Sequence, residues 1–93
     1  MDLFTNRARA TLFALESEAR DLVDAINRTP GWRADAPNWG LFDNGVTWIS
    51  VVAWHKRTRQ GYVCRSLGEW QSYLAKDDAW YLQRLIEAEE RSG

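Results

Sequence analysis

Residues 46–66, VTWISVVAWHKRTRQGYVCRS, decide the fold of this chain. The segment Val46–His55 is rich in β-branched and aromatic residues, which favour strands. A basic turn follows at Lys56–Gly61, and Tyr62–Arg65 then predicts a returning edge strand. A charge such as Arg65 on an edge strand hinders edge-to-edge pairing. We therefore expect an antiparallel hairpin at the centre of the structure.

The first strand of this hairpin has no clearly polar face. Successive side chains of a strand point to opposite sides. One side holds Val46, Trp48, Ser50, Val52 and Trp54, and the other holds Thr47, Ile49, Val51, Ala53 and His55. Strands that are buried on both faces carry apolar residues on both. We therefore expect a central strand that is covered, at least in part, on both sides.

The segment before the hairpin, residues 2–28, predicts one long amphipathic helix. An apolar stripe recurs at steps of three and four residues, the period of a helix. The stripe consists of Leu12, Leu15, Ala19, Leu22 and Ile26. Pro30-Gly31 ends the helix. Two interpretations stay open: the helix packs on the sheet, or it pairs with its copy in a homodimer.

The segment 29–45, TPGWRADAPNWGLFDNG, contains both prolines and predicts a structured loop with a short strand at Trp39–Phe42. Asp43-Asn44-Gly45 is a strong turn signal, so residues 39–42 should pair with residues 46–55. Trp32 and Trp39 either close the edge of a small core or form an exposed pair that binds a partner.

The segment after the hairpin predicts one or two helices. Ser66-Leu67-Gly68-Glu69 matches a capping box, so a helix should begin at Leu67. Asp77-Asp78 offers a second cap, which favours a break there over one continuous helix. The expected fold is α+β, with a long N-terminal helix, a three-stranded antiparallel sheet and one or two C-terminal helices. We expect residues 1–93 to form a single compact domain.

The expected α-β-β-β-α order is shared with double-stranded RNA-binding domains, and in part with integrase arm-binding domains. The likeness is one of order alone. The helix after the third strand begins SLGEWQSYLA, which is acidic and aromatic where the RNA-binding domain has a lysine cluster. No motif of either family is present in the chain, so this order adds nothing to the functional prediction.

Composition narrows the class of protein. The chain has 93 residues and a net charge of −1, but its basic residues dominate the middle and its acidic ones the C-terminal third. Its one cysteine, Cys64, cannot form an internal disulfide, which predicts a reducing, cytoplasmic location. The N-terminus has no signal pattern, and no apolar run is long enough to span a membrane. We therefore expect a cytoplasmic protein without a membrane partner.

Catalytic and metal signals are weak. His55 and Cys64 are the first pair to test, because a hairpin register that places His55 opposite Tyr62 brings them close on one face. Glu87, Glu89 and Glu90 predict a solvated helix face rather than an acid–base pair. No nucleotide-binding or nucleophile motif occurs, and one histidine with one cysteine makes a poor zinc site. We expect no enzyme activity, no metal and no cofactor.

The basic turn is the strongest candidate for a binding site. Lys56, Arg57 and Arg59 place three positive charges on a hairpin tip, with Arg65 near the end of the next strand. Three interpretations stay open: a solvated turn, a contact with an acidic protein surface, or a grip on nucleic-acid phosphates with Trp48 or Trp54 stacking on bases. The pI of about 5.8 disfavours nucleic acid.

The favoured interpretation is a small non-enzymatic protein-binding module. The six tryptophans and the arginine bias support it, since interface hot spots use these residue types. The predicted partner-binding residues are Lys56, Arg57, Arg59, Arg65, Trp32 and Trp39. Small chains of this kind are often phage or mobile-element proteins that inhibit a host complex. One expectation is therefore that this chain is such an inhibitor. The alternative is a nucleic-acid-binding module that uses the hairpin tip and the sheet aromatics.

Overall fold

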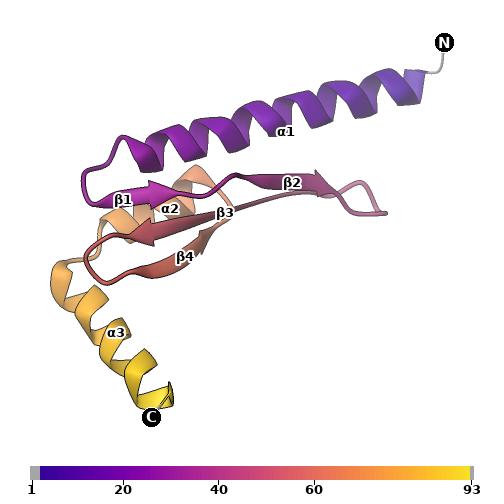
Figure 1. Ribbon diagram of the computed structural model, residues 1–93. Coiled ribbons are helices and arrows are strands. Elements are labelled where there is room, and N and C mark those ends of the chain that lie inside the picture. Colours follow the sequence, from indigo (N-terminus) through magenta and orange to yellow (C-terminus); the bar gives the residue numbers. More distant parts are fainter. Residues whose placement is uncertain (1–2, 93) are drawn as a thin grey trace.

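The computed structural model describes residues 3–92, with the side chains of residue 7 and residues 9–92. The elements are α1 (Leu3–Asn27), β1 (Trp32–Ala34), β2 (Asn38–Leu41), β3 (Thr47–His55), β4 (Gln60–Cys64), α2 (Leu67–Leu74) and α3 (Asp78–Ser92). α1 runs along the sheet, and α3 projects away from it (Figure 1). The α+β class is confirmed, with a four-stranded antiparallel sheet in place of the three strands predicted.

β3 is the central strand, as predicted. β4 pairs along one of its edges, while β1 and β2 follow one another along the other edge. Ala34 lies opposite Ala53 and Asn38 opposite Ser50, so the outer strand has one residue more than β3 between these pairs. The extra residue makes a bulge after Asp35, whose N–H still donates to the Val52 carbonyl at 3.1 Å. β1 and β2 are therefore two halves of one bulged edge strand.

The sequence prediction missed β1 because it has only three residues between turn residues. These residues fall within the predicted loop of residues 29–45. Its extended backbone depends on β3: Trp32 lies opposite His55, and the Lys56 N–H donates to the Gly31 carbonyl at 2.9 Å. Gly31 has φ +86°, a value that suits glycine, and it turns the chain from the end of α1 into this strand. Tertiary pairing therefore decides the conformation of this segment.

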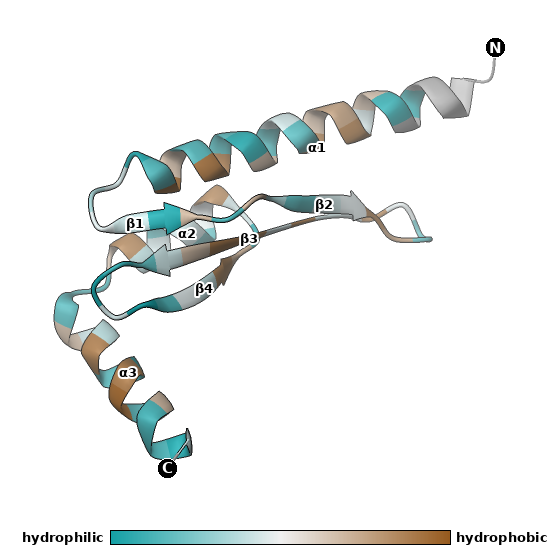
Figure 2. Cartoon of the chain, in the orientation of Figure 1, coloured by the Kyte–Doolittle hydropathy of each residue, from teal (hydrophilic) through white to brown (hydrophobic). Residues whose placement is uncertain are grey.

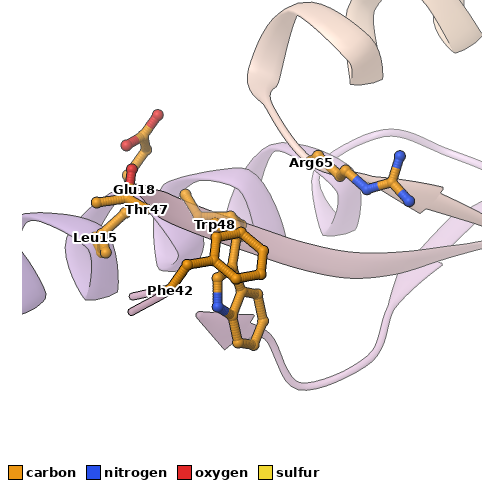
Figure 3. A pocket seen from close by; sticks show the side chains of 7 residues that line it. Leu15, Glu18, Phe42, Thr47, Trp48 and Arg65 are labelled. Carbon is orange, nitrogen blue, oxygen red and sulfur yellow. The ribbon is translucent and has the colours of Figure 1, made fainter. Parts of the chain in front are cut away.

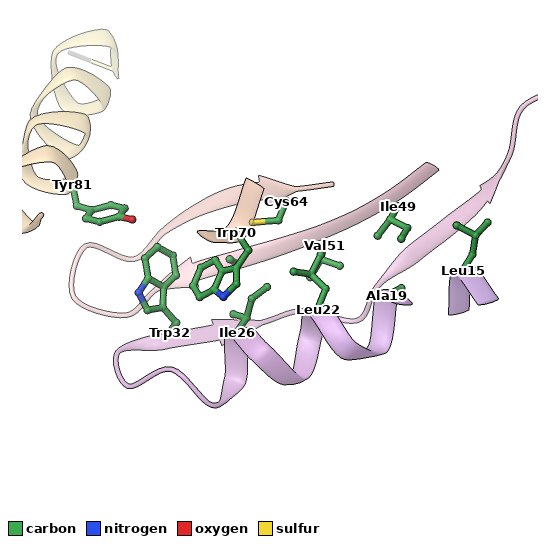
Figure 4. Close-up of a cluster of buried hydrophobic side chains, with 11 residues drawn as sticks. Leu15, Ala19, Leu22, Ile26, Trp32, Ile49, Val51, Cys64, Trp70 and Tyr81 are labelled. Atoms are coloured by element: carbon green, nitrogen blue, oxygen red, sulfur yellow. The ribbon is translucent and has the colours of Figure 1, made fainter. Parts of the chain in front are cut away.

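The core lies between α1 and one face of the sheet, which we call the inner face. The odd-numbered residues of β3 point to this face, and Val51 and Ala53 have no exposed surface. Leu15, Ala19, Leu22 and Ile26 of the predicted α1 stripe belong to the same buried cluster and lie along this face (Figure 4). The prediction that this helix packs on the sheet is confirmed for these four residues. Residue 2, the predicted first residue of the helix, lies outside the described residues.

The C-terminal segment forms two helices with separate caps. The Ser66 Oγ accepts the Glu69 N–H at 3.0 Å, so the predicted capping box begins α2. The Asp77 carboxylate accepts the Trp80 N–H at 3.0 Å and caps α3. The break between the helices, left open by the sequence, therefore lies at residues 75–77. Trp70 of α2 is 1% exposed and completes the core.

An aromatic cluster joins the end of the sheet to both C-terminal helices. Trp32 is its centre, with ring centroids 4.9 Å from His55, 4.9 Å from Trp70 and 5.4 Å from Tyr81. The Tyr81 hydroxyl donates to the Tyr73 carbonyl, which connects α3 to α2. The first turn of α3 is thereby packed against the body of the protein, while Leu82 and Ile86 further along the helix are exposed.

The opposite face of the sheet, which we call the open face, is not covered in the same way. Within residues 3–92, the strand residues that are fully buried all belong to the inner face. Trp48, Val52 and Trp54 of β3 are half-buried, and Val63 of β4 is 41% exposed. The open face of β3 is therefore covered only in part, within the prediction of at least partial cover on both sides, whereas the inner face is fully buried at Val51 and Ala53. Hydropathy colouring shows the apolar segments of β3 and β4 (Figure 2).

Candidate binding surface

The loop between β3 and β4 holds the basic residues in a fixed turn. It comprises Lys56–Arg59, two residues shorter than the predicted turn, because Gln60 and Gly61 belong to β4. The Arg59 N–H donates to the His55 carbonyl at 2.7 Å, and Arg59 has φ +59°. Thr58 is only 7% exposed, so it anchors the turn from inside. The basic side chains on either side of it are left exposed.

His55 secures this turn in its neutral form. Its Nδ1 accepts the Thr58 N–H at 3.2 Å and lies 2.9 Å from the Thr58 hydroxyl. An acceptor Nδ1 places the ring proton on Nε2. Burial lowers the pKa of His55, and the nearby Arg57 lowers it further, while Asp78 acts in the opposite direction. The imidazole also stacks on Tyr81 with ring centroids 4.5 Å apart. The histidine therefore has a structural role.

The three cations of the turn do not act together. Arg57 reaches across to α3 and forms an ion pair with Asp78 at 3.2 Å, with both side chains about 70% exposed. Lys56 and Arg59 instead border a shallow hollow of about 380 Å³. We call it the cationic hollow, and its lining is Arg33, Trp54, His55, Lys56 and Arg59. Arg33 of β1 thus joins two of the predicted residues at this end of the open face.

Trp54 forms one wall of the cationic hollow and is held in place from two sides. Its Nε1–H donates to Asp35 at 2.7 Å, and the Arg33 guanidinium binds the other oxygen of the same carboxylate at 2.9 Å. Gly61 lies beneath the ring, where a Cβ would approach within 3.1 Å of two ring carbons. The hydrogen bond from Trp54, followed by the Arg33 contacts, lowers the pKa of Asp35, so this clamp is charged at neutral pH.

The far end of the open face repeats this construction. Trp48 packs over Gly40, where a Cβ would lie 2.9 Å from the ring. Phe42 is 57% exposed, and its ring centroid lies 6.4 Å from that of Trp48. Val52 and Val63, which are paired across β3 and β4, fill the middle. The open face is therefore an apolar strip with arginine and lysine side chains at the hairpin end.

The structure separates the other predicted site residues from this surface. Trp32 is 7% exposed in the aromatic cluster, so the interpretation of Trp32 as an exposed binding residue is wrong. Trp39 lies opposite Ile49 on the inner face and packs against the core. Arg65 lies at the other end of β4 from the turn, about 17 Å along the strand. It cannot act together with Lys56 and Arg59 on one small ligand.

The predicted His55–Cys64 pair does not form. His55 lies opposite Gln60 and Cys64 opposite Val51, because the shorter loop shifts the register by two residues. The two side chains are therefore about 13 Å apart along the sheet. Cys64 is fully buried, and burial raises its pKa to about 11, so it is a thiol at neutral pH. This is the environment of a structural cysteine.

Residues 3–92 contain no cluster of three or more histidine, cysteine, aspartate or glutamate side chains that could bind an ion. Glu89 and Glu90 are exposed near the end of α3, as predicted for a solvated face. Glu87 is half-buried and binds Arg84 at 2.9 Å, which lowers its pKa.

Sequence reasoning missed Arg33 and Asp35. Both lie in the segment that was predicted to be a loop, and their sequence neighbours carry no recognisable motif. Arg33 lies opposite Trp54 in the register of β1 and β3, which is the signal that brings them together. That register could not be derived from the sequence without first recognising the three-residue strand.

No protein-family model, curated protein or solved structure matches this chain. No helix within residues 3–92 is long and apolar enough to cross a membrane.

Proposed function

We propose that this protein is a small protein-binding module whose contact surface is the open face of the sheet, and that it binds an acidic protein surface. One observation carries the proposal. A partly exposed apolar strip, Trp48, Val52, Trp54 and Val63, continues into the cationic hollow bordered by Arg33, Lys56 and Arg59. Within residues 3–92, no element buries this strip.

The composition of this surface is typical of protein–protein interfaces, which combine hot-spot residues with a polar rim. Tryptophan and arginine supply most interface hot spots, and a polar rim excludes water around them. Trp54 is fixed by Asp35 and Gly61 before binding, so little side-chain entropy would be lost on association. Exposed cations at the rim would accelerate encounter with an acidic surface and add little affinity by themselves.

Selection of peptides from a random display library on the immobilised protein tests the proposal. We expect enriched peptides that combine aspartate or glutamate with aromatic or aliphatic residues. Lys56→Glu/Arg59→Glu should reduce the affinity of these peptides about tenfold or more, since it reverses two charges of the cationic hollow. Arg7→Glu/Arg9→Glu is the matched control, because it makes the same change in net charge on exposed α1 residues.

Two results contradict the proposal. One is enrichment of peptides without acidic residues. The other is an equal loss of affinity in both charge-reversal variants, which would indicate a general effect of net charge rather than a site. Thermal unfolding of each variant shows whether it is folded, and the exposed positions make large losses of stability unexpected.

A second candidate function, nucleic-acid binding, is favoured by one specific observation. The half-buried Trp54 ring stands beside three cations, an arrangement suited to a base that stacks on the ring while its phosphate meets Lys56 or Arg59. Titration with single-stranded and double-stranded oligonucleotides, followed by tryptophan fluorescence, tests it. The logarithm of the binding constant should fall linearly with that of the salt concentration. An unchanged signal at low salt would exclude this candidate.

A further inference from the structure

The central strand is longer than one of its two neighbours. β3 spans Thr47–His55, but β4 pairs only with residues 51–55, since Cys64 lies opposite Val51. Beyond Cys64 the chain leaves the sheet and enters α2 at Leu67. Residues 47–50 of β3 are therefore paired with β2 on one side and with no strand of the described chain on the other.

Within residues 3–92, two residues of the free edge have backbone groups without a hydrogen-bond partner. The carbonyls of Val46 and Val52 accept from Phe42 and Asp35, so even-numbered residues direct their backbone groups to the β1–β2 side. Thr47 and Ile49 consequently direct their N–H and C=O groups to the free edge. Two donors and two acceptors are thus available there at the spacing of an antiparallel partner strand.

The surroundings of this edge lack the features that usually prevent strand addition. Native edge strands are protected by charges, prolines or short length. Residues 44–50, NGVTWIS, contain no charge and no proline. Beside the edge lies a second hollow of about 380 Å³, which we call the edge hollow (Figure 3). Its lining is Leu15, Glu18, Phe42, Thr47, Trp48, Ile49 and Arg65.

We propose that this edge binds the same edge of a second copy of the chain. An antiparallel arrangement with its two-fold axis at Trp48 places Thr47 opposite Ile49 of the second copy and Ile49 opposite Thr47 of the second copy. All four free backbone groups of each chain are then hydrogen-bonded. Since residues 44–50 of both copies are uncharged, no like charges meet between the two paired segments.

Charge complementarity at the ends of the contact selects this partner. In this arrangement the 43–45 turn of one copy lies beside the end of β4 in the other, and so brings Asp43 near Arg65. Both side chains are exposed, and neither forms an ion pair with another residue of the described chain. The two-fold axis makes this contact twice. It gives Arg65 a role separate from that of Lys56 and Arg59.

The edge also explains how a dimer can form although the α1 stripe is occupied. Leu15, Ala19, Leu22 and Ile26, which a helix-paired dimer would need, are already packed on the sheet. Pairing through the β3 edge leaves this packing intact and joins the two sheets into one. The contact is defined by backbone groups at 47–50 and does not depend on what the open face binds.

Sedimentation equilibrium of the purified chain tests the proposal. We expect a mass of about twice 10.8 kDa at micromolar concentration. Thr47→Pro should weaken dimerisation about tenfold or more, because it removes an N–H of the edge from each copy. The same N–H is not used in the pairing with β2, so the fold should persist. Thr47→Ala, which keeps the N–H, is the matched control and should remain dimeric.

A charge exchange tests the arrangement itself. Arg65→Asp and Asp43→Arg should each weaken the dimer severalfold, and the double variant should recover most of the loss. The proposal is overturned if the wild-type chain sediments as a monomer up to about 100 µM, or if Thr47→Pro and Thr47→Ala dimerise equally. It is also overturned if both single charge variants dimerise like the wild type, or if the double variant is weaker than either.

Discussion

The two faces of β3 carry similar side chains but differ in how far these side chains are buried. On the inner face Val51 and Ala53 have no exposed surface, whereas their neighbours Val52 and Trp54 on the open face keep part of theirs. Valine occurs at adjacent positions, and only one of the two is fully buried. The apolar character of a strand therefore predicts that it is central in the sheet, but it does not predict which face the helices cover.

The difference indicates that the two faces contribute to separate properties. The inner face, with α1 and Trp70, removes apolar surface from water and stabilises the fold. The open face has its tryptophans packed on Gly40 and Gly61 rather than under a helix, so it keeps apolar surface available for a partner. Substitutions on the two faces should accordingly divide into those that affect stability and those that affect binding.

Truncation of Trp70 should have the largest effect on stability. Trp70→Ala removes a side chain that is 1% exposed and leaves a large cavity beside Trp32. We expect a loss of about 3–5 kcal/mol in the free energy of unfolding, measured by urea denaturation. Leu74→Ala on the same helix is the control, because Leu74 is 44% exposed and its loss should be far smaller. Equal losses would contradict the assigned core.

The valine pair compares the two faces directly. Val51→Thr places a hydroxyl in the core and should cost about 1–3 kcal/mol. Val52→Thr makes the same chemical change one residue away on the open face, and should change stability by about 0.5 kcal/mol or less. Urea denaturation of both variants measures the difference. A larger loss for Val52→Thr would mean that the open face is covered in solution.

The pH dependence of stability tests the role of His55, the last residue of β3. Since burial lowers the pKa of His55, the unfolded chain takes up the proton first as the pH falls below about 6.5. Stability should therefore decrease between neutral pH and the folded pKa, and the decrease should be complete below it. Urea midpoints at about pH 7.5 and about pH 5.5 measure this. His55→Gln should show a smaller decrease, and an equal one would rule out His55 as its source.

A small effect on stability, no larger than that at Val52, is expected at Val63. Val63→Thr keeps the β-branched shape on the open face, so the free energy of unfolding should change by about 0.5 kcal/mol or less. The affinity for peptides selected on the wild-type surface should fall severalfold, because the middle of the apolar strip becomes polar. Unchanged affinity in a titration by calorimetry would place the contact elsewhere.

Local sequence signals predicted the elements that are specified by residues close together in the chain. Four of the five residues of the α1 stripe are buried, Leu12 being 37% exposed, and the Ser66–Glu69 capping box, the Asp77 cap and the hairpin turn at Asp43–Gly45 all appear in the structure. The long strand was found because β-branched and aromatic residues make up six of its nine positions, which leaves little ambiguity. β1 was missed, since a three-residue strand has no periodicity of its own.

The candidate surface was predicted only in part. Lys56 and Arg59 were recognised from their charge, and Trp54 was considered as a stacking residue. Arg33 and Asp35 were missed because only the pairing of β1 with β3 places them next to Trp54, and the sequence prediction did not include β1. Trp32 was misassigned, since composition cannot distinguish a core tryptophan from an exposed one. The His55–Cys64 pairing failed because a two-residue difference in loop length shifts the whole β3–β4 register.

The sequence by itself determined the hairpin at residues 46–66, its central position and the basic charge of its turn. Alternation and turn residues are local properties, so they can be read along the chain. Only the tertiary structure decided which face of β3 is open, which cations meet Trp54 and where the edge of β3 is left unpaired. These features depend on register and on helix placement, which arise from contacts between residues far apart in the sequence.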